Sequence, residues 1–172
     1  MGIKQELERF AGQVGFTLAY LDETTSTNDV ARDPRYDAGA VVIAERQSRG
    51  RGQRGNSWSS SAGANLTFSV VLCPGFLETA QQFYLSKAVS LAVCDTVESF
   101  GVRPQVKWPN DIYIDGRKVA GILIENDLAG NFLSRSVVGI GINVNQTEFD
   151  PALPNPTSLA VAAGRKLDRA EV

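Results

Sequence analysis

The chain has 172 residues, of which 43% are hydrophobic and 21% charged, and a formal net charge of −2. These values are typical of one globular domain with its own core, and the acidic balance argues against a general nucleic-acid-binding protein. No apolar run approaches the roughly 20 residues of a membrane span, and the charged start MGIKQELERF has no signal-peptide core. The sequence contains no histidine, which excludes Ser-His and Cys-His catalysis and removes the commonest metal ligand.

Hydrophobic spacing predicts the elements of the first part of the chain. Apolar residues at spacings of four, three and four over 3–14 indicate a helix with one apolar face. Capping residues in TTSTNDVARD indicate a short second helix. Strands are expected over 16–23, 41–47 and 65–72, and a long helix over about 79–100. Apolar residues surround most of that long helix, so we expect it to be the central buried helix.

Hairpin signals dominate the remainder of the chain. The Asp115-Gly116 pair predicts a tight turn inside the alternating run 112–126, and the turn residues at 129–131 lead into a further strand over 134–145. A helical segment interrupted at Gly164 ends the sequence. Consecutive hairpins around one long helix indicate an α+β domain with a mixed, largely antiparallel sheet.

The two cysteines, Cys73 and Cys94, lie in the apolar runs SVVLCP and LAVCDTV. We interpret them as buried free thiols, which suits the reducing cytosol and predicts a cytoplasmic protein.

The stretch RQSRGRGQRGNSW, which follows the strand predicted over 41–47, alternates arginine and glycine. Glycine lets backbone N–H groups approach a ligand closely, and arginine supplies planar, permanently charged donors for carboxylate or phosphate. The combination predicts a loop that binds an anion. KWPND, at 107–111, places a second cation near the expected end of a strand, and the two segments together indicate an enzyme that handles a phosphorylated intermediate.

Six motifs occur in a fixed order: STN (26–28), GRGQRG (50–55) with Trp58, GANL (63–66), KWPND (107–111), RKVAGIL (117–123) and GIGINVN (139–145). This set resembles the catalytic domain of biotin protein ligases. The resemblance implies a class II aminoacyl-tRNA synthetase-like fold and an ATP-dependent reaction in two steps. Biotin and ATP would form biotinyl-5′-AMP, and the biotinyl group would then pass to one lysine of a biotin carboxyl carrier protein domain. It also implies Mg²⁺ bound with ATP, and it assigns no protein side chain as a metal ligand.

The same resemblance implies which residues form the site. Lys107, Arg51 and Arg54 are the expected catalytic cations, with the Lys107 ammonium between the biotin carboxylate and the α-phosphate. The expected biotin-binding residues are Ser26, Thr27, Asn28, Gln47, Arg51, Gly52, Gln53, Lys107, Gly121 and Leu123. The expected ATP- or adenylate-binding residues are Gly50, Arg51, Gln53, Arg54, Trp58, Asn110, Lys118 and Asn143.

Ordinary interpretations of these residues stay open beside the functional ones. Lys107 would otherwise be a solvated lysine beside a core tryptophan, Ser26 a helix N-cap, and Trp58 a packing residue. The acceptor lysine of the second step must lose a proton, and the sequence offers either Asp111 or water to receive it.

Three departures from the family pattern are expected to matter. Gln53 stands where many members carry a basic residue. We expect no N-terminal DNA-binding domain, hence no DNA partner, because too few residues precede the first motif, and the family's small C-terminal β-barrel is absent from 1–172.

A homodimer paired through a sheet edge is an open alternative. The rival functions are a lipoate or octanoate ligase of the same fold, a biotin-binding domain without full turnover, and an RNA-binding protein that uses the Gly/Arg loop.

Overall fold

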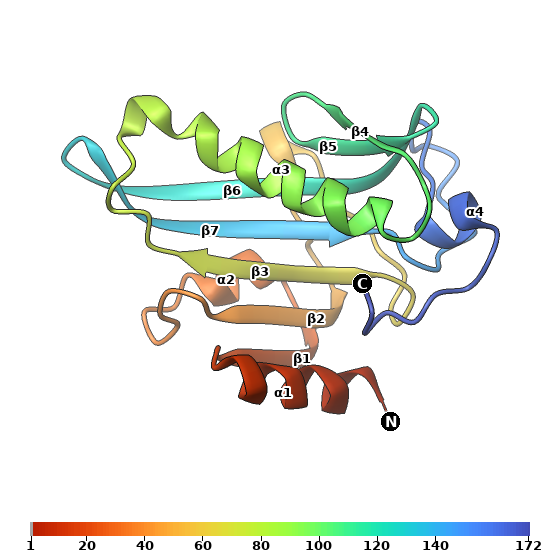
Figure 1. Ribbon diagram of the computed structural model, residues 1–172, viewed down its shortest axis with the longest axis horizontal. Helices are drawn as coiled ribbons and strands as arrows, with labels where there is room; N and C mark the ends of the chain where they lie inside the picture. The colour runs from red at the N-terminus through yellow and green to blue at the C-terminus, as the bar shows by residue number, and fades with distance from the viewer. Residues whose placement is uncertain (1) are drawn as a thin grey trace.

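A seven-stranded sheet organises the computed structural model, which describes residues 2–172 (Figure 1). The strand order is β1-β2-β3-β7-β6-β5-β4; β1 and β2 are parallel and every other neighbouring pair is antiparallel. The strands are β1 (Leu18–Thr24), β2 (Val41–Gln47), β3 (Leu66–Leu72), β4 (Pro104–Lys107), β5 (Asp111–Ile114), β6 (Arg117–Ala129) and β7 (Phe132–Ile142). The predicted α+β class with a mixed, largely antiparallel sheet is therefore confirmed.

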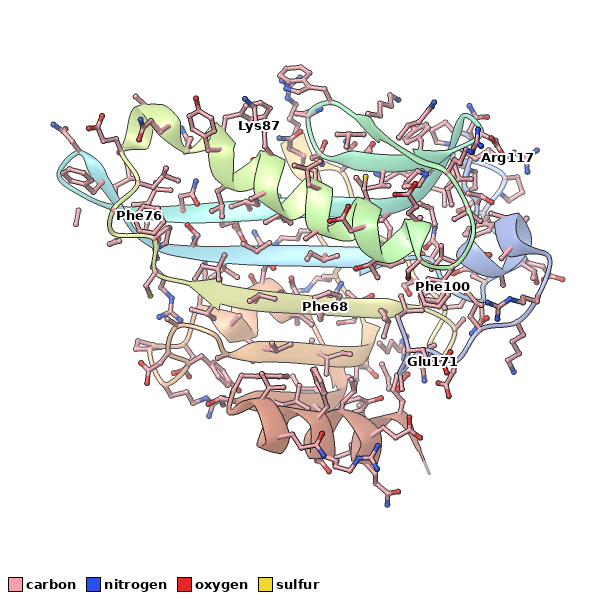
Figure 2. All side chains as sticks on the ribbon, in the orientation of Figure 1. Phe68, Phe76, Lys87, Phe100, Arg117 and Glu171 are labelled. Atoms are coloured by element: carbon pink, nitrogen blue, oxygen red, sulfur yellow. The ribbon has the colours of Figure 1, made fainter. Side chains whose placement is uncertain are left out.

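Helices cover the two faces of the sheet. The helices are α1 (Ile3–Val14), α2 (Thr27–Ala31), α3 (Phe83–Glu98) and α4 (Leu159–Ala163), with short 3₁₀ turns at Gln53–Gly55 and Thr79–Gln81. One apolar cluster lies between the sheet and the α1/α3 side, where Phe68 and Phe100 pack against it (Figure 2). A smaller cluster around Val42, Val71 and Val137 lies on the opposite face, beneath α2. Because side chains alternate between the faces of a strand, each face of the same strands presents its own residues to a different helix.

The long helix is less buried than its composition indicates. α3 crosses in front of β6 and β7 (Figure 1), and its buried residues are only Ser90, Val93 and Val97. Leu91, on the far side of the helix, is 60% exposed. The expectation of a central buried helix is wrong, because a helix laid on one face of a sheet buries only the stripe that faces the sheet.

The predicted hairpin turns are present. Asp115 and Gly116 both adopt positive φ, at 48° and 75°, as the two central residues of a type I′ turn require. The β6–β7 hairpin turns at Gly130, which has φ 59°. Gly164, with φ 68°, ends α4 in the left-handed conformation, and residues 165–172 contain no helix, so the expected continuation of the helical segment is wrong.

Both cysteines are free thiols, as predicted, but the predicted burial is wrong. Cys73 is exposed and Cys94 is only half-buried. Cys73 comes just after the end of β3 and before Pro74, so the apolar run that suggested burial has already left the sheet.

Among residues 2–172, no helix combines the length and the apolar character needed to cross a bilayer.

Candidate active site

A pocket of about 180 Å³ lies on the α2 side of the sheet. The walls come from α2, the loop after β2, the start of β3, the segment joining β4 to β5, the first half of β6 and the end of β7. The residues that line it are Ser26, Thr27, Asn28, Gln47, Arg51, Gly52, Gln53, Arg54, Asn56, Ser57, Trp58, Thr67, Phe68, Trp108, Pro109, Asn110, Asp111, Lys118, Gly121, Ile122, Leu123, Gly139, Ile140 and Gly141. The sheet thus brings together five of the six predicted motifs; GANL contributes no lining residue.

Buried polar side chains form one end of this pocket. Thr27 and Asn28 at the start of α2 are each 2% exposed. Gln47 Oε1 accepts a hydrogen bond from the Thr27 backbone N–H at 2.6 Å. The Ser69 hydroxyl donates to Asn28 Oδ1 at 2.6 Å and lies 2.7 Å from Thr27 Oγ1. This end of the pocket therefore offers both donors and acceptors away from bulk water.

Ser26 occupies the N-cap position of α2, but its side chain makes no capping hydrogen bond. It is 3% exposed and lines the pocket. The position expected for an N-cap is confirmed, and its hydroxyl is not used by the helix.

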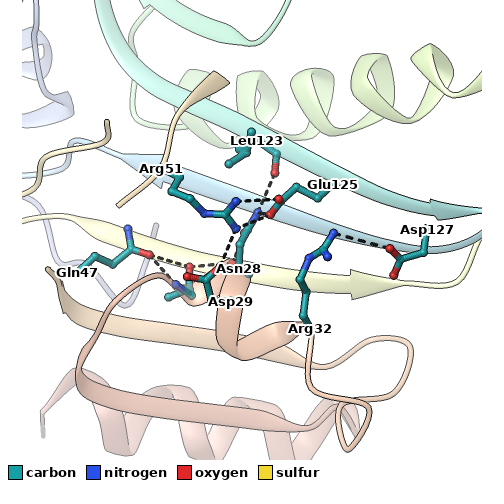
Figure 3. A network of polar contacts seen from close by, with 10 residues as sticks. Asn28, Asp29, Arg32, Gln47, Arg51, Leu123, Glu125 and Asp127 are labelled. Carbon is teal, nitrogen blue, oxygen red and sulfur yellow. Dashed lines mark hydrogen bonds and ion pairs between the residues drawn. The ribbon is translucent and has the colours of Figure 1, made fainter. Parts of the chain in front are cut away.

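Arg51 connects the Gly/Arg loop to the sheet (Figure 3). Its Nη1 and Nη2 donate to the two carboxylate oxygens of Glu125 at 2.9 and 2.8 Å, and Nη2 also donates to Asp29 Oδ1 at 2.8 Å. The hydrogen bond to Glu125 raises the pKa of the Arg51 guanidinium. Burial by itself would raise the pKa of the Glu125 carboxyl, but hydrogen bonds from Arg51 and Asn28 and the Arg51 charge bring it below its ordinary value.

The Gly/Arg loop itself is a narrow hairpin. The Gly52 N–H donates to Asn56 O at 2.6 Å and the Trp58 N–H to Gly50 O at 2.9 Å. Arg54, at the tip, has φ 57°. Its guanidinium makes no ion pair with any residue from 2 to 172.

The Trp58 side chain lies on glycines of β6 and β7. A Cβ built on Gly141 would lie 2.3 Å from Cε2 of the indole, and one built on Gly121 would lie 3.1 Å from Cζ3. The indole Nε1 is buried without an acceptor in the described chain, and the Lys118 ammonium lies 5.6 Å from the ring centroid. These glycines leave room for an aromatic ring at the bottom of the pocket.

A second glycine contact serves the polar end of the pocket. A Cβ on Gly139 would lie 2.3 Å from Asn28 Oδ1. Gly139 therefore lets the Asn28 amide reach the backbone of β7.

Three of the predicted site residues do not line the pocket. Lys107, the last residue of β4, is paired directly with Asp111, which lines the pocket, so the two side chains share one face of the sheet. The Lys107 residue is exposed, and its ammonium donates to Tyr113 Oη at 2.9 Å. Asn143 is buried and donates to Thr157 O at 3.0 Å. Gly50 packs behind the loop, where a Cβ would lie 2.3 Å from Trp58 O. The other predicted residues all line it.

Three residues that hold the pocket-lining side chains in place were not predicted as site residues. Glu125, Asp29 and Ser69 hold the residues that line the pocket, as described above. The available signal was strand alternation: Glu125 follows Gly121 and Leu123 at a spacing of two, so it projects from the same face. Asp111, at the rim, is paired with Lys118 at 2.6 Å.

Residues 18–143 match the Biotin/lipoate A/B protein ligase family. The chain belongs to this family. It is 36% identical over 178 residues to the bifunctional ligase/repressor BirA of Bacillus subtilis, covering 99% of this chain and 53% of that protein. It is also 36% identical to a biotin–[acetyl-CoA-carboxylase] ligase of Paracoccus denitrificans, with 88% and 66% of the two chains covered. The chain spans about half the length of the Bacillus relative.

Solved structures of this ligase family have the same fold. A biotin protein ligase from Aquifex aeolicus, in complex with biotin and ATP, superposes with a TM-score of 0.76 at 34% identity, covering 90% of this chain and 64% of that one. A Leishmania major biotin protein ligase with biotin superposes with a TM-score of 0.74 at 26% identity, covering 90% and 69%. The resemblance to biotin protein ligases and the implied class II synthetase-like fold are confirmed.

Proposed function

We propose that this domain is the catalytic part of an ATP-dependent biotin protein ligase. It would join biotin to ATP to form biotinyl-5′-AMP, and then transfer the biotinyl group to a lysine of a biotin carboxyl carrier protein domain. The observation that supports biotin most directly is the buried polar end of the pocket.

Biotin carries a cyclic urea with one carbonyl acceptor and two N–H donors, whereas the dithiolane of lipoate and the chain of octanoate carry none. Thr27, Asn28 and Gln47 supply donors and acceptors at the polar end. An apolar ligand cannot use the remaining donors and acceptors of such buried groups, so a site built this way discriminates against a ligand without matching groups.

In the first step, a biotin carboxylate oxygen forms a bond to the α-phosphorus, the bond from that phosphorus to the bridging oxygen breaks, and pyrophosphate leaves. No protein nucleophile is needed, which suits a chain without histidine. The protein supplies position and positive charge. Arg54 and Lys118 line the pocket, and we retain Lys107 as the predicted cation at the reacting carboxylate because it projects from the same sheet face.

In the second step, the amine of the acceptor lysine attacks the carbonyl carbon and AMP leaves. The amine must first lose a proton. Asp111 is already paired with Lys118 at 2.6 Å, so we propose that this proton goes to water rather than to Asp111.

The carboxylates of the site do not form a free metal-binding set. Asp111 is paired with Lys118, and Asp29 and Glu125 with Arg51. Within residues 2–172 no cluster of three or more metal-ligating side chains occurs. We therefore propose Mg²⁺ only as the companion of the ATP phosphates, which is its usual mode of binding, and route no step through a protein-bound metal.

We further propose a cytoplasmic protein, and the free edges of β1 and β4 as the surfaces through which a homodimer would pair. Three of the four β4 residues are exposed, and an unpaired edge offers backbone donors and acceptors to a second strand. Light scattering at two protein concentrations, with a Val106→Pro variant of β4 for comparison, tests the dimer.

Pyrophosphate release tests the proposed activity. The purified chain is assayed with ATP and Mg²⁺ plus biotin, lipoate or octanoate in turn. Release of pyrophosphate with biotin, but not with lipoate or octanoate, supports the proposal. Release with lipoate or octanoate would assign the chain to a different branch of the family, and biotin binding without release would make it a binding domain.

A further inference from the structure

The Arg51 guanidinium is already occupied by carboxylates. It forms a two-pronged contact with Glu125 at 2.9 and 2.8 Å and a third contact with Asp29 at 2.8 Å. Parallel N–H donors of this kind fix geometry as well as adding energy. The Glu125 side chain is 20% exposed and that of Arg51 40%, so water screens the contact only in part.

The charges of this cluster argue against Arg51 as the direct ligand of an anion. One positive group faces two negative ones, which leaves a net charge of −1. A carboxylate or phosphate brought to this guanidinium would also meet Glu125 and Asp29. Arg54 and Lys118 line the same pocket; Lys118 faces a single carboxylate, and Arg54 has no ion-pair partner among residues 2–172.

Glu125 also holds the polar end of the pocket. Its Oε2 accepts a hydrogen bond from Asn28 Nδ2 at 2.8 Å, the same oxygen that accepts from Arg51 Nη2. The Asn28 Oδ1 in turn accepts from Ser69. One carboxylate on β6 therefore joins the start of α2 to the Gly/Arg loop, and it lies 97 residues from Asn28 and 74 residues from Arg51 in the sequence (Figure 3).

We propose that Glu125 is a positioning residue: with help from Asp29 it holds Arg51, and through Arg51 it seats the Gly50–Gly55 hairpin over the pocket beside Asn28. Arg51 is the attachment point of the hairpin, and Arg54 and Lys118 present the positive charge. The position of the hairpin over the pocket does not depend on a bound ligand, whereas the effect of that position on catalysis rests on the proposed function.

Limited trypsin digestion of the ligand-free chain tests the seating. Trypsin cuts after arginine, so cleavage after Arg51 and Arg54, followed by mass spectrometry, reports how often the hairpin opens. Cleavage after Arg117, at the β5–β6 turn, serves as the internal reference. We expect Glu125→Gln to raise the ratio of hairpin to reference cleavage about fivefold, the scale of a partly exposed charge pair.

Asp127→Asn is the matched control. Asp127 lies on the same strand, and it makes a looser, exposed ion pair with Arg32 at 3.7 Å. Its ratio should equal that of the unaltered chain. An unchanged ratio in Glu125→Gln, or an equal rise in Asp127→Asn, would overturn the proposal.

A double-mutant cycle tests the link from Glu125 through Arg51 to catalysis. Glu125→Gln should lower kcat/KM for biotin about fivefold in pyrophosphate release, but cause no further loss when Arg51 is already alanine. Additive losses would show that Glu125 acts by another route. If even the unaltered chain releases no pyrophosphate, the proposed function fails, and the trypsin ratio still decides the seating.

Discussion

The indole of Trp58 and the backbone of Gly141 are in such close contact that a Cβ at residue 141 would lie 2.3 Å from the ring. Gly141 is thus present for its lack of a side chain rather than for its backbone angles.

Gly141→Ala should displace the Trp58 indole, because backbone on β7 cannot move without disturbing its two neighbouring strands. We expect a loss of about 1–3 kcal/mol in the free energy of unfolding, the usual cost of overpacking, and weaker binding of ATP. Urea denaturation and nucleotide titration measure the two effects. Gly12→Ala is the control, since its Cβ would meet no atom within 4 Å; a Gly141→Ala variant as stable as this control would contradict the packing described.

Gly139→Ala should act on biotin instead. Its Cβ would lie 2.3 Å from Asn28 Oδ1, so the Asn28 amide must turn away from Ser69 and from the polar end of the pocket. We expect the dissociation constant for biotin to rise roughly tenfold or more, because the Asn28 amide would lose its hydrogen bond from Ser69 and would no longer face the ligand. Isothermal titration measures it, and unchanged biotin affinity would remove Asn28 from the proposed biotin site.

Lys107→Ala should abolish adenylate formation while leaving the fold intact. The ammonium lies on the exposed surface, where it donates only to Tyr113, so its removal leaves no buried group without a partner. We expect a fall of at least about 100-fold in biotin-dependent pyrophosphate release, the scale seen when one charge-stabilising group is lost. Arg103→Ala is the control, because Arg103 is an exposed cation just before β4 that does not line the pocket.

Lys118→Ala distinguishes the two lysines of the site. Full activity in Lys107→Ala together with loss in Lys118→Ala would transfer the role to the lysine that already lines the pocket.

Gln53→Arg should retain the adenylate longer. Gln53 lines the pocket beside Arg54, and an arginine there adds one positive charge near the phosphate, where opposite charges attract at short range. The release rate of biotinyl-5′-AMP, measured by rapid filtration, should fall in the variant. Release as fast as from the unaltered chain would mean that residue 53 does not face the phosphate.

Glu125 should contribute stability that depends on pH. Its pKa is lowered in the folded chain, where Arg51, Asn28 and the charge of Arg32 act on it. The contribution is therefore complete above the unfolded value of about 4.3 and is lost as the pH falls through the lower folded value. The difference in unfolding free energy between the unaltered chain and Glu125→Gln should shrink as the pH falls from about 5 to about 3, because this interval contains the unfolded pKa of glutamate. A difference that grows over this interval would contradict the direction of the shift.

Local patterns predicted much of the fold. Strand alternation and turn residues such as Asp115-Gly116 act over a few neighbours, so the sequence shows them directly. The burial of α3 was overestimated because composition does not reveal which neighbour covers a helix. The burial of Cys73 was overestimated because its apolar neighbours belong to β3, whereas Cys73 itself follows the end of that strand.

The site was predicted as a set of motifs but not as a network. The contact between Arg51 and Glu125 depends on the register of β6 and on the hairpin above it, and neither is visible at either residue alone. Lys107 shows the same limit. The motif predicts its presence, whereas the pairing of β4 with β5 sets Tyr113 diagonally across from it and turns its ammonium outward.

Isothermal titration of biotin into the purified chain, followed by a non-hydrolysable ATP analogue with Mg²⁺, tests the central claim most directly. We predict saturable heat from biotin that is lost in Asn28→Ala, no heat from lipoate, and nucleotide binding once biotin is bound. Heat from lipoate and none from biotin would contradict the account.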